Sequence, residues 1–428
     1  MGSDNFVTLK VSGIVDKASS LMYKTKEIED PQMELLLLRC CTGSAKLIYW
    51  LRNCVPEVIK DQILLFDNAI DQSLQHILGV PVHDQDRLKI HLPLSMGGLG
   101  IAKASLIANA AFVSSVASSW MLQPNSSPRK GFQEACNVIT SRGMTVPTLP
   151  NKCSSSIVSP SSSQTKEFAQ NKLMLSINSD IRQKSITDAD MRQAIILNGR
   201  TCKGSNYWLT SPPDLRSRST IDAAPFRLLL KYSIGMPLFD GPLKCPDCGS
   251  LQDKFGHHAL SCRVGSVAID KHNSIVRAIF SQMKQAKISC SMEAFNPMSD
   301  SRQRPGDIHM SDFDNFGDAF FDVSVINICA DSYVTRAAKG VLEGSSIRYV
   351  AKMKKYPDLG PRFKPLILES TGGWHKLSFN HIRTLADHIA SRTNKAASDA
   401  LNSLLRAASF CLQRHQGTML VRRCLGLN

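Results

Sequence analysis

The chain lacks the features that mark membrane and secreted proteins. No apolar run approaches the roughly 20 residues that a helix needs to span a bilayer. The first residues, MGSDNFVTLKVSG, have no basic segment followed by an apolar one, and Phe6 stands where N-myristoylation needs Ser or Thr. No basic cluster typical of a nuclear signal is evident either. We therefore expect an intracellular protein that has no membrane partner.

Acidic residues are too few to balance the basic ones. There are 51 Lys and Arg against 36 Asp and Glu, which gives a formal net charge of +15. Such an excess favours a polyanionic partner such as nucleic acid, although a basic surface exposed only to solvent has the same composition. The 13 cysteines are odd in number and scattered over 428 residues. Their number and distribution argue against a secreted disulfide framework and for a reducing compartment.

Apolar residues at intervals of three and four predict helices over residues 5–120. The segment QILLFDNAIDQSLQHILG has this pattern, and its last residue, Gly79, predicts the end of the helix. Residues 146–164 are rich in Pro and Ser and have little to bury. We expect a linker or an exposed insertion there.

The second half of the chain mixes helical and strand patterns. Residues 304–328 contain two β-prone segments around a polar turn with Asn315 and Gly317, which predicts an antiparallel hairpin. Residues 363–374 predict a buried strand that leads into a glycine turn. Helices are expected on both sides of these strands, at residues 268–286, 336–356 and 375–415.

The segment CPDCGSLQDKFGHHALSC has the spacing of a zinc site. Cys245 and Cys248 form C-x2-C, which lets two thiolates bind one ion from a tight turn, and His258 and Cys262 lie one helical turn apart. Together they form C-x2-C-x9-H-x3-C, four ligands of a closed, structural zinc site. The alternatives are buried cysteines beside a core histidine, or a site in which His257 replaces His258. The H-x3-C spacing favours His258.

Two carboxylates lie on the arms of the predicted hairpin. Asp307 and Asp322 could hold Mg²⁺ or Mn²⁺, which prefer hard oxygen ligands, for phosphodiester chemistry. Asp322 stands between Phe321 and Val323, where an ionised carboxylate is costly unless it binds a metal or a cation. The alternative is that both acids only edge a turn. Glu293 is a candidate third ligand. The remaining acids of the turn are expected to be solvated, namely Asp312, Asp314 and Asp318.

Further motifs follow the cysteine-rich segment in a defined order. They are RPGD, DVSV, a helix that ends in AKMKKY, and FKPLILESTGGW. This order resembles the C-terminal region of non-LTR retrotransposon polyproteins whose CCHC zinc knuckle precedes a restriction-like endonuclease of the PD-(D/E)xK type. The segments MELLLLRCCTGSAKLIYWLRNCVP and RLKIHLPLSMGGLGIAKASLIANAAFVSS look like the thumb and connecting helices of the same polyproteins. The resemblance covers nearly the whole chain apart from the Ser-rich stretch.

The resemblance implies roles for three residues. Asp307 of RPGD matches the metal-binding Asp of the family, and Asp322 of DVS matches the second acid. Lys352 matches the catalytic lysine, which this branch places in a K-x3-Y setting that ends here at Tyr356. Lys355 is the alternative lysine. The resemblance therefore implies that Asp307, Asp322 and Lys352 form a nuclease site that uses Mg²⁺ or Mn²⁺.

The chain departs from the family pattern at two positions. Gly306 interrupts the Pro-Asp dipeptide, and Ser324 stands where simpler PD-(D/E)xK enzymes have their lysine. Glu369 matches a late strand of the family and either faces the site or ends the strand; we favour the second. The neighbouring basic residues Lys339 and Lys354 are expected to be solvated.

The resemblance also implies the architecture. We expect an α+β protein with a mixed sheet flanked by helices in its nuclease part. The expected regions are a thumb-like helical region (1–122), a linker with a helical connector (123–204), a helix with the zinc knuckle (205–265), and a restriction-like endonuclease domain (266–428).

Two functions are compatible with these motifs. The first is a metal-dependent endonuclease that nicks target DNA, with element RNA as a second partner and the nucleus as its place of action. The second is a nucleic-acid-binding zinc protein, or transposon relic, whose nuclease site is inactive. Polymerase activity is not expected, because the chain has no Asp-Asp dipeptide. The upstream polymerase region would be a separate partner or lost.

Overall fold

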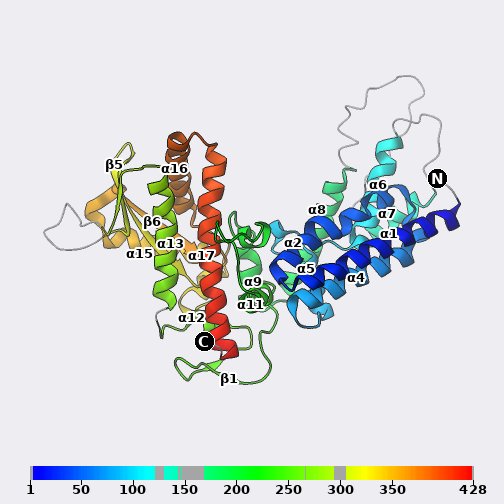
Figure 1. The fold of residues 1–428 in the computed structure, drawn as a ribbon, viewed down its shortest axis with the longest axis horizontal. Coiled ribbons are helices and arrows are strands. Elements are labelled where there is room, and N and C mark those ends of the chain that lie inside the picture. Colours follow the sequence, from blue (N-terminus) through cyan, green and yellow to red (C-terminus); the bar gives the residue numbers. More distant parts are fainter. Residues whose placement is uncertain are drawn as a thin grey trace. The chain divides into compact units, whose positions relative to one another are not determined.

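The computed structural model describes residues 3–120, 130–142, 146, 168–265, 267–293 and 305–426 (Figure 1). Two compact units divide the chain. The first unit contains residues 1–93 and 98–187, and the second contains residues 94–97 and 188–428. The expected Pro- and Ser-rich linker at residues 146–164 lies outside the described residues, apart from Val146. In the described part of the chain, no helix is both long enough and apolar enough to cross a membrane.

The first unit is helical, as the apolar periodicity of residues 5–120 predicts. Its helices are α1 (Asp4–Thr25), α2 (Pro31–Leu37), α3 (Ile48–Asn53), α4 (Lys60–Leu78), α5 (Asp84–His91), α6 (Ala104–Trp120), α7 (Phe132–Thr140) and α8 (Gln170–Thr187). Helix α4 buries apolar residues at intervals of three and four, including Phe66, Ile70 and Leu74. It ends at Gly79, whose φ of 71° suits glycine.

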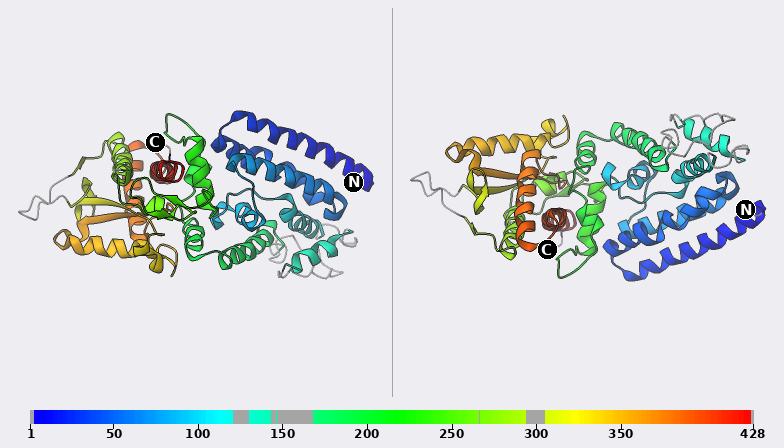
Figure 2. Two further views of the ribbon diagram at one scale, coloured as in Figure 1. Left: turned by 90° about the horizontal axis from the view of Figure 1, so that it is seen from below. Right: turned by 90° about the horizontal axis from the view of Figure 1, so that it is seen from above.

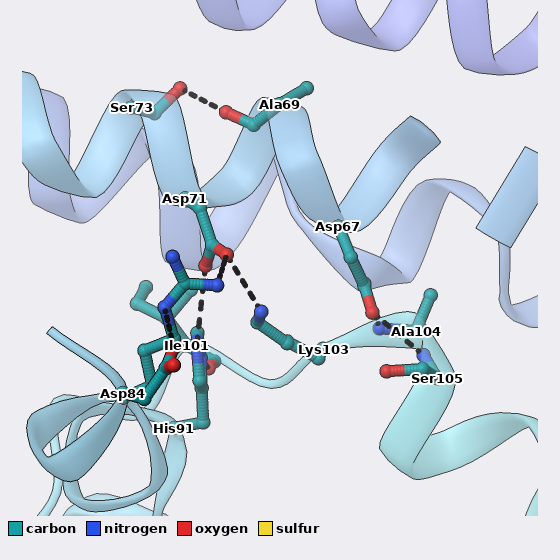
Figure 3. Close-up of polar contacts among 11 residues, drawn as sticks. Asp67, Ala69, Asp71, Ser73, Asp84, His91, Ile101, Lys103, Ala104 and Ser105 are labelled. Carbon is teal, nitrogen blue, oxygen red and sulfur yellow. Dashed lines mark hydrogen bonds and ion pairs between the residues drawn. The ribbon is translucent and has the colours of Figure 1, made fainter. Parts of the chain in front are cut away.

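Buried carboxylates on α4 contact α5 and the start of α6 (Figure 3). Asp67 accepts hydrogen bonds from the N–H groups of Ala104 (2.7 Å) and Ser105 (3.2 Å), which begin α6. Asp71 lies one helical turn later and contacts three basic side chains, those of Arg87, His91 and Lys103. These contacts satisfy the carboxylates within the unit, so we read the network as structural.

The second unit combines helices with two small sheets. Its helices are α9 (Met191–Gly199), α10 (Tyr207–Thr210), α11 (Ala223–Ser233), α12 (His257–Ser261), α13 (Val267–Gln285), α14 (Asp331–Ala337), α15 (Glu343–Lys355), α16 (Lys376–Thr393) and α17 (Ala397–Leu425). The strands are β1 (Leu243–Lys244), β2 (Leu251–Gln252), β3 (Cys290–Met292), β4 (Ile308–Asp314), β5 (Gly317–Ile326) and β6 (Phe363–Glu369). The fold class is therefore α+β, as expected.

The larger sheet has the strand order β3-β4-β5-β6. Strands β3, β4 and β5 are antiparallel neighbours, so the predicted hairpin is confirmed, with His309 paired to Phe320. Strand β6 lies parallel to β5, with Asp322 opposite Pro365. The chain between β5 and β6 passes through α14 and α15, the usual helical crossover of a parallel pair. The sheet is thus mixed.

Helices cover both faces of this sheet (Figure 2). Alternate residues of β5 point to opposite faces. Phe321 and Val323 belong to the main core, which α13, α16 and α17 complete. Phe320 faces the other side, where it packs in a smaller cluster with Tyr356 and Phe363. Asp322 shares this second face, which places its carboxylate toward α15.

Two local expectations are wrong. The helix predicted at residues 336–356 is two helices, because α14 ends at Ala337 and α15 begins at Glu343, with Gly340 between them. Asp314 and Asp318 are not merely solvated turn residues. Asp314 lies 2.5 Å from the ammonium of Lys364, and Asp318 pairs with the side chains of His309 and Arg362. Of these partners, His309 lies in β4, Lys364 lies in β6, and Arg362 directly precedes β6.

Candidate metal centres

The four residues of the predicted zinc knuckle come together. Ligand atoms of Cys245, Cys248, His258 and Cys262 all lie within 4.8 Å of one another. The Sγ atom of Cys248 is 3.2 Å from Nε2 of His258, and the Sγ atoms of Cys245 and Cys262 are 4.0 Å apart. Helix α12 sets the last two ligands one turn apart, as the spacing predicts.

The donor set fits zinc. Three thiolates and one imidazole are a common set for a closed tetrahedral site, and the short ligand-to-ligand distances suit one ion of that size. Hydrogen bonds from Ser250 lower the pKa of the Cys248 thiol to about 6, which favours the thiolate that binds metal. His257 is instead buried against the ring of Tyr232, so the preference for His258 is confirmed. The knuckle could therefore bind zinc.

The end of α17 closes over the knuckle. Arg423, whose side chain is 2% exposed, donates to Oδ2 of Asp247 at 2.7 Å, between the first two cysteines. The same guanidinium donates to the backbone carbonyls of Ala259 (2.5 Å) and Val264 (2.7 Å). The hydrogen bond from Arg423 lowers the pKa of Asp247. Because one buried cation ties the two ends of the knuckle to the last helix, the knuckle is part of the packed second unit.

A second cluster forms around the hairpin. Asp307 immediately precedes β4, Asp322 lies in β5, and Lys352 lies in the last turns of α15. The ammonium of Lys352 is 2.6 Å from Oδ2 of Asp322. Asp307 lies beside Asp322, because it forms hydrogen bonds with Phe321 and Val323, the two residues that flank Asp322 in β5. The three residues proposed from the resemblance thus lie in one place, although they come from three elements.

Hydrogen bonds hold Asp307 in position. Its N–H donates to the carbonyl of Phe321 at 2.8 Å, and its Oδ2 accepts the N–H of Val323 at 2.7 Å. Both partners flank Asp322 in β5. The carboxylate of Asp307 is therefore fixed against the strand that carries the second acid. The Gly306 that interrupts the Pro-Asp dipeptide packs closely on the same strand, since an added Cβ would lie 2.9 Å from the carbonyl oxygen of Phe321.

Burial and charge act in opposite directions on Asp322. Its residue is 8% exposed. Burial raises the pKa of this carboxyl above its ordinary value, and the nearby Lys352 offsets part of the rise. An ionised carboxylate in such a place needs a cation, and Lys352 supplies one. The carboxylate of Asp322 and the ammonium of Lys352 are consequently held together beside the second acid, Asp307.

His272 is a member of the cluster that sequence analysis missed. Its Nε2 lies 3.2 Å from Oδ1 of Asp307. That contact is the main cause of a raised pKa of His272, and the charges of Asp322 and Lys352 also act on it. The sequence carried one indication. His272 lies four positions before the buried Val276 on α13, so a polar side chain occupies the helix face that is turned toward the core.

Other candidates lie apart from this cluster. Lys355 is exposed and stacks over the ring of Tyr356 at 4.9 Å, so Lys352 is the lysine that contacts Asp322. The backbone N–H of Glu293 donates to the carbonyl of Asp307 at 3.1 Å, and the Glu293 residue is exposed. Glu369 pairs in register with Ile326, four residues along β5 from Asp322, at the far end of the strand.

The two centres differ in how complete their ligand sets are. Among the described residues, the knuckle is the one group of three or more Cys, His, Asp or Glu residues close enough to hold a metal ion, with its ligand atoms within 4.8 Å of one another. The hairpin cluster offers two fixed carboxylates and one imidazole in a looser group. Carboxylate oxygens are the donors that Mg²⁺ and Mn²⁺ prefer, so the chemistry of the donors fits the expected ion.

Comparison with known proteins adds no assignment. No family model matches the chain, and no curated protein matches it. The interpretation of both centres therefore depends on the residues themselves.

Proposed function

We propose that this chain is a metal-dependent DNA endonuclease that nicks its target, related to the C-terminal region of non-LTR retrotransposon polyproteins. The observation that carries the proposal is the convergence of Asp307, Asp322 and Lys352 from three separate parts of the chain. A further support is the mixed sheet with helices on both faces, the coarse architecture that the resemblance implies. We infer no polymerase activity, because the sequence has no Asp-Asp dipeptide.

Each of the three side chains has a role in this proposal. Asp307 and Asp322 would hold Mg²⁺ or Mn²⁺, which when bound polarises the phosphate and lowers the pKa of a bound water. Lys352 would orient the attacking water or neutralise the charge that develops on the phosphate. Its ion pair with Asp322 keeps the ammonium within reach of that phosphate. The buried position of Asp322 strengthens these electrostatic interactions.

The expected substrate is DNA, which the protein would bind mainly through phosphates. The net charge of +15 favours this, and α15 adds the exposed Lys355 beside Lys352. Element RNA is a second partner of the same chemistry. The zinc knuckle would act by shaping the second unit, since Arg423 ties it to α17. Access to chromosomal DNA would require the nucleus.

A nicking assay on supercoiled plasmid tests the proposal. Wild-type protein should convert the plasmid to the relaxed form with Mg²⁺ or Mn²⁺ and not with EDTA. Asp322→Asn and Lys352→Met should each lower the rate by a factor of about 100 or more, because each removes a group that contacts the reacting phosphate or its metal.

Matched controls lie in the same elements. Asp312→Asn changes an exposed acid of the hairpin whose φ of 59° Asn tolerates, and Lys354→Met changes an exposed lysine of α15. Both controls should nick at the wild-type rate. If folded, zinc-loaded protein binds DNA but never nicks it, the alternative function is correct, namely a nucleic-acid-binding zinc protein with an inactive site.

A further inference from the structure

We propose that His272 is a direct ligand of the metal held by Asp307 and Asp322, and that this site prefers Mn²⁺ to Mg²⁺. The inference rests on the proposed function only in taking the two aspartates as the metal-binding pair. It assigns to α13 a role in the site and selects between the two ions that the carboxylates alone accept equally.

The distance between His272 and Asp307 suits two ligands of one ion. Nε2 of His272 lies 3.2 Å from Oδ1 of Asp307. Two atoms that bind neighbouring positions of an octahedral ion, at bond lengths of about 2.1 Å, are separated by about 3 Å. The observed separation therefore needs little change for both atoms to bind the same ion.

The two oxygens of Asp307 have different partners. Oδ2 accepts the N–H of Val323 at 2.7 Å, which fixes the plane of the carboxylate against β5. Oδ1 is the oxygen that points toward His272. The side chains of Asp307 and His272 are 24% and 31% exposed, so an ion and its remaining waters can reach this side of the cluster from solvent. Asp322 supplies the second carboxylate from the next strand.

The position of His272 on α13 makes its ring part of the scaffold. Helix α13 packs against the sheet through Val276, one turn after His272, and through Ile279 and Met283. The helix backbone is thus fixed relative to β5 by the main core. An imidazole carried by such a helix is held in place before any ion binds, which is the condition for a selective site.

Ligand chemistry determines the preference between the ions. Mg²⁺ is bound almost entirely through oxygen, whereas imidazole nitrogen suits first-row transition metals better. Mn²⁺ accepts carboxylate, water and imidazole together. A set of two carboxylates and one imidazole therefore favours Mn²⁺, and replacement of the imidazole should remove that preference.

Mn²⁺ binding to the zinc-loaded, full-length chain tests the inference without an activity assay. Continuous-wave EPR measures free Mn²⁺ during a titration, and competition with Mg²⁺ gives the relative affinity. We expect His272→Gln to weaken Mn²⁺ binding by about tenfold or more and to leave Mg²⁺ binding nearly unchanged. His309→Gln is the matched control, because His309 lies in the same hairpin but pairs with Asp318.

Pulsed EPR on the wild-type protein gives a second readout that needs no variant. A directly bound imidazole produces a nitrogen modulation of the Mn²⁺ echo, and His272→Gln should abolish it. Persistence of that modulation in the variant, or wild-type Mn²⁺ affinity in it, would overturn the inference. So would a wild-type chain that binds no Mn²⁺.

If the metal site exists but the nuclease proposal is wrong, the same measurements give a different set of results. In that case Mn²⁺ binds with the nitrogen modulation, and Asp307→Asn removes the binding, yet plasmid is never nicked. The metal site would then stand and the enzymatic function would not.

Discussion

The zinc knuckle and the hairpin cluster are both candidate metal centres of the second unit, and they are built in opposite ways. The knuckle takes all four ligands from one short segment, and its soft donors lie within 4.8 Å of one another. The hairpin cluster takes Asp307, Asp322, Lys352 and His272 from four elements. A closed soft set suits a structural ion, whereas a looser oxygen-rich set leaves room for substrate.

The two centres also differ in what supports them. Arg423 reaches the knuckle from the last helix and neutralises a buried acid there. In the hairpin cluster Lys352 both neutralises Asp322 and stands beside the proposed metal ligands. Stability is therefore expected to depend most on the knuckle, and activity on the hairpin cluster. Three sets of measurements test this expectation.

Loss of zinc should have the largest effect. Structural zinc contributes about 10–16 kcal/mol in zinc-finger peptides, more than the net stability of most domains. We expect Cys262→Ser, or removal of zinc by a chelator, to unfold the second unit. Thermal unfolding followed together with the zinc content of the protein checks this.

Cys41→Ser is the control, since Cys41 is an exposed thiol of the first unit. It should leave both the zinc content and the unfolding temperature unchanged. Equal unfolding temperatures for the zinc-loaded and zinc-free chain would remove the structural role of the knuckle.

Arg423→Met should have the next largest effect. The substitution leaves Asp247 buried without its main cation and removes the donors to the carbonyls of Ala259 and Val264. Breaking a buried pair in this way costs about 3–5 kcal/mol. Denaturant unfolding measures the loss.

Arg422→Met provides the matched comparison. Arg422 pairs with the other oxygen of Asp247, at 2.7 Å, but its side chain is 41% exposed. Such a pair contributes about 1 kcal/mol or less. Similar losses for the two variants would mean that Arg423 does not act as the buried tie between the knuckle and α17.

Glu369→Gln should have a smaller effect that depends on pH. Burial raises the pKa of Glu369 from 4.5 to about 7, and hydrogen bonds from Ser345 oppose the rise. A raised pKa means that the folded state binds the proton more tightly than the unfolded state. The contribution of Glu369 to the free energy of unfolding is therefore fully present below about pH 4.5. It is lost as the pH rises through about 7, and the total loss is about 3 kcal/mol.

The glutamine variant lacks this titration but keeps an oxygen that can accept the N–H of Ser345. We expect the variant to match the wild type at pH 4.5 and to exceed its free energy of unfolding at pH 8. Cys202 beside it stays neutral in this range, because burial raises its pKa to about 12. Parallel stability curves for the two proteins would contradict the prediction.

Local patterns in the sequence predicted local structure well. Ligand spacing identified the knuckle because its four residues meet through one turn and one short helix. The helix patterns of α4 and α13, and the β-prone segments around the polar turn of the hairpin, are likewise local signals. The predicted hairpin already brought Asp307 and Asp322 together. Lys352 joins them through a helical crossover, so only the resemblance pointed to that lysine.

Residues whose partners are distant were the ones missed. His272 joins the cluster because α13 packs on the sheet, and nothing near it in the sequence specifies that contact. Asp314 and Asp318 were expected to be solvated. They pair instead with Lys364 and Arg362, which follow the α14–α15 crossover in the sequence. The amino-acid composition of a turn predicts the turn itself. It does not predict which distant segment of the chain will pack against that turn.

The tie between Arg423 and Asp247 spans 176 residues of sequence. The knuckle is complete long before that arginine has been synthesised, so a nascent chain can load zinc while Asp247 is still hydrated. The final turn of α17 must then dock before the acid can be buried without cost. A chain cut short before Arg423 would thus keep the four knuckle residues but leave Asp247 without its buried cation.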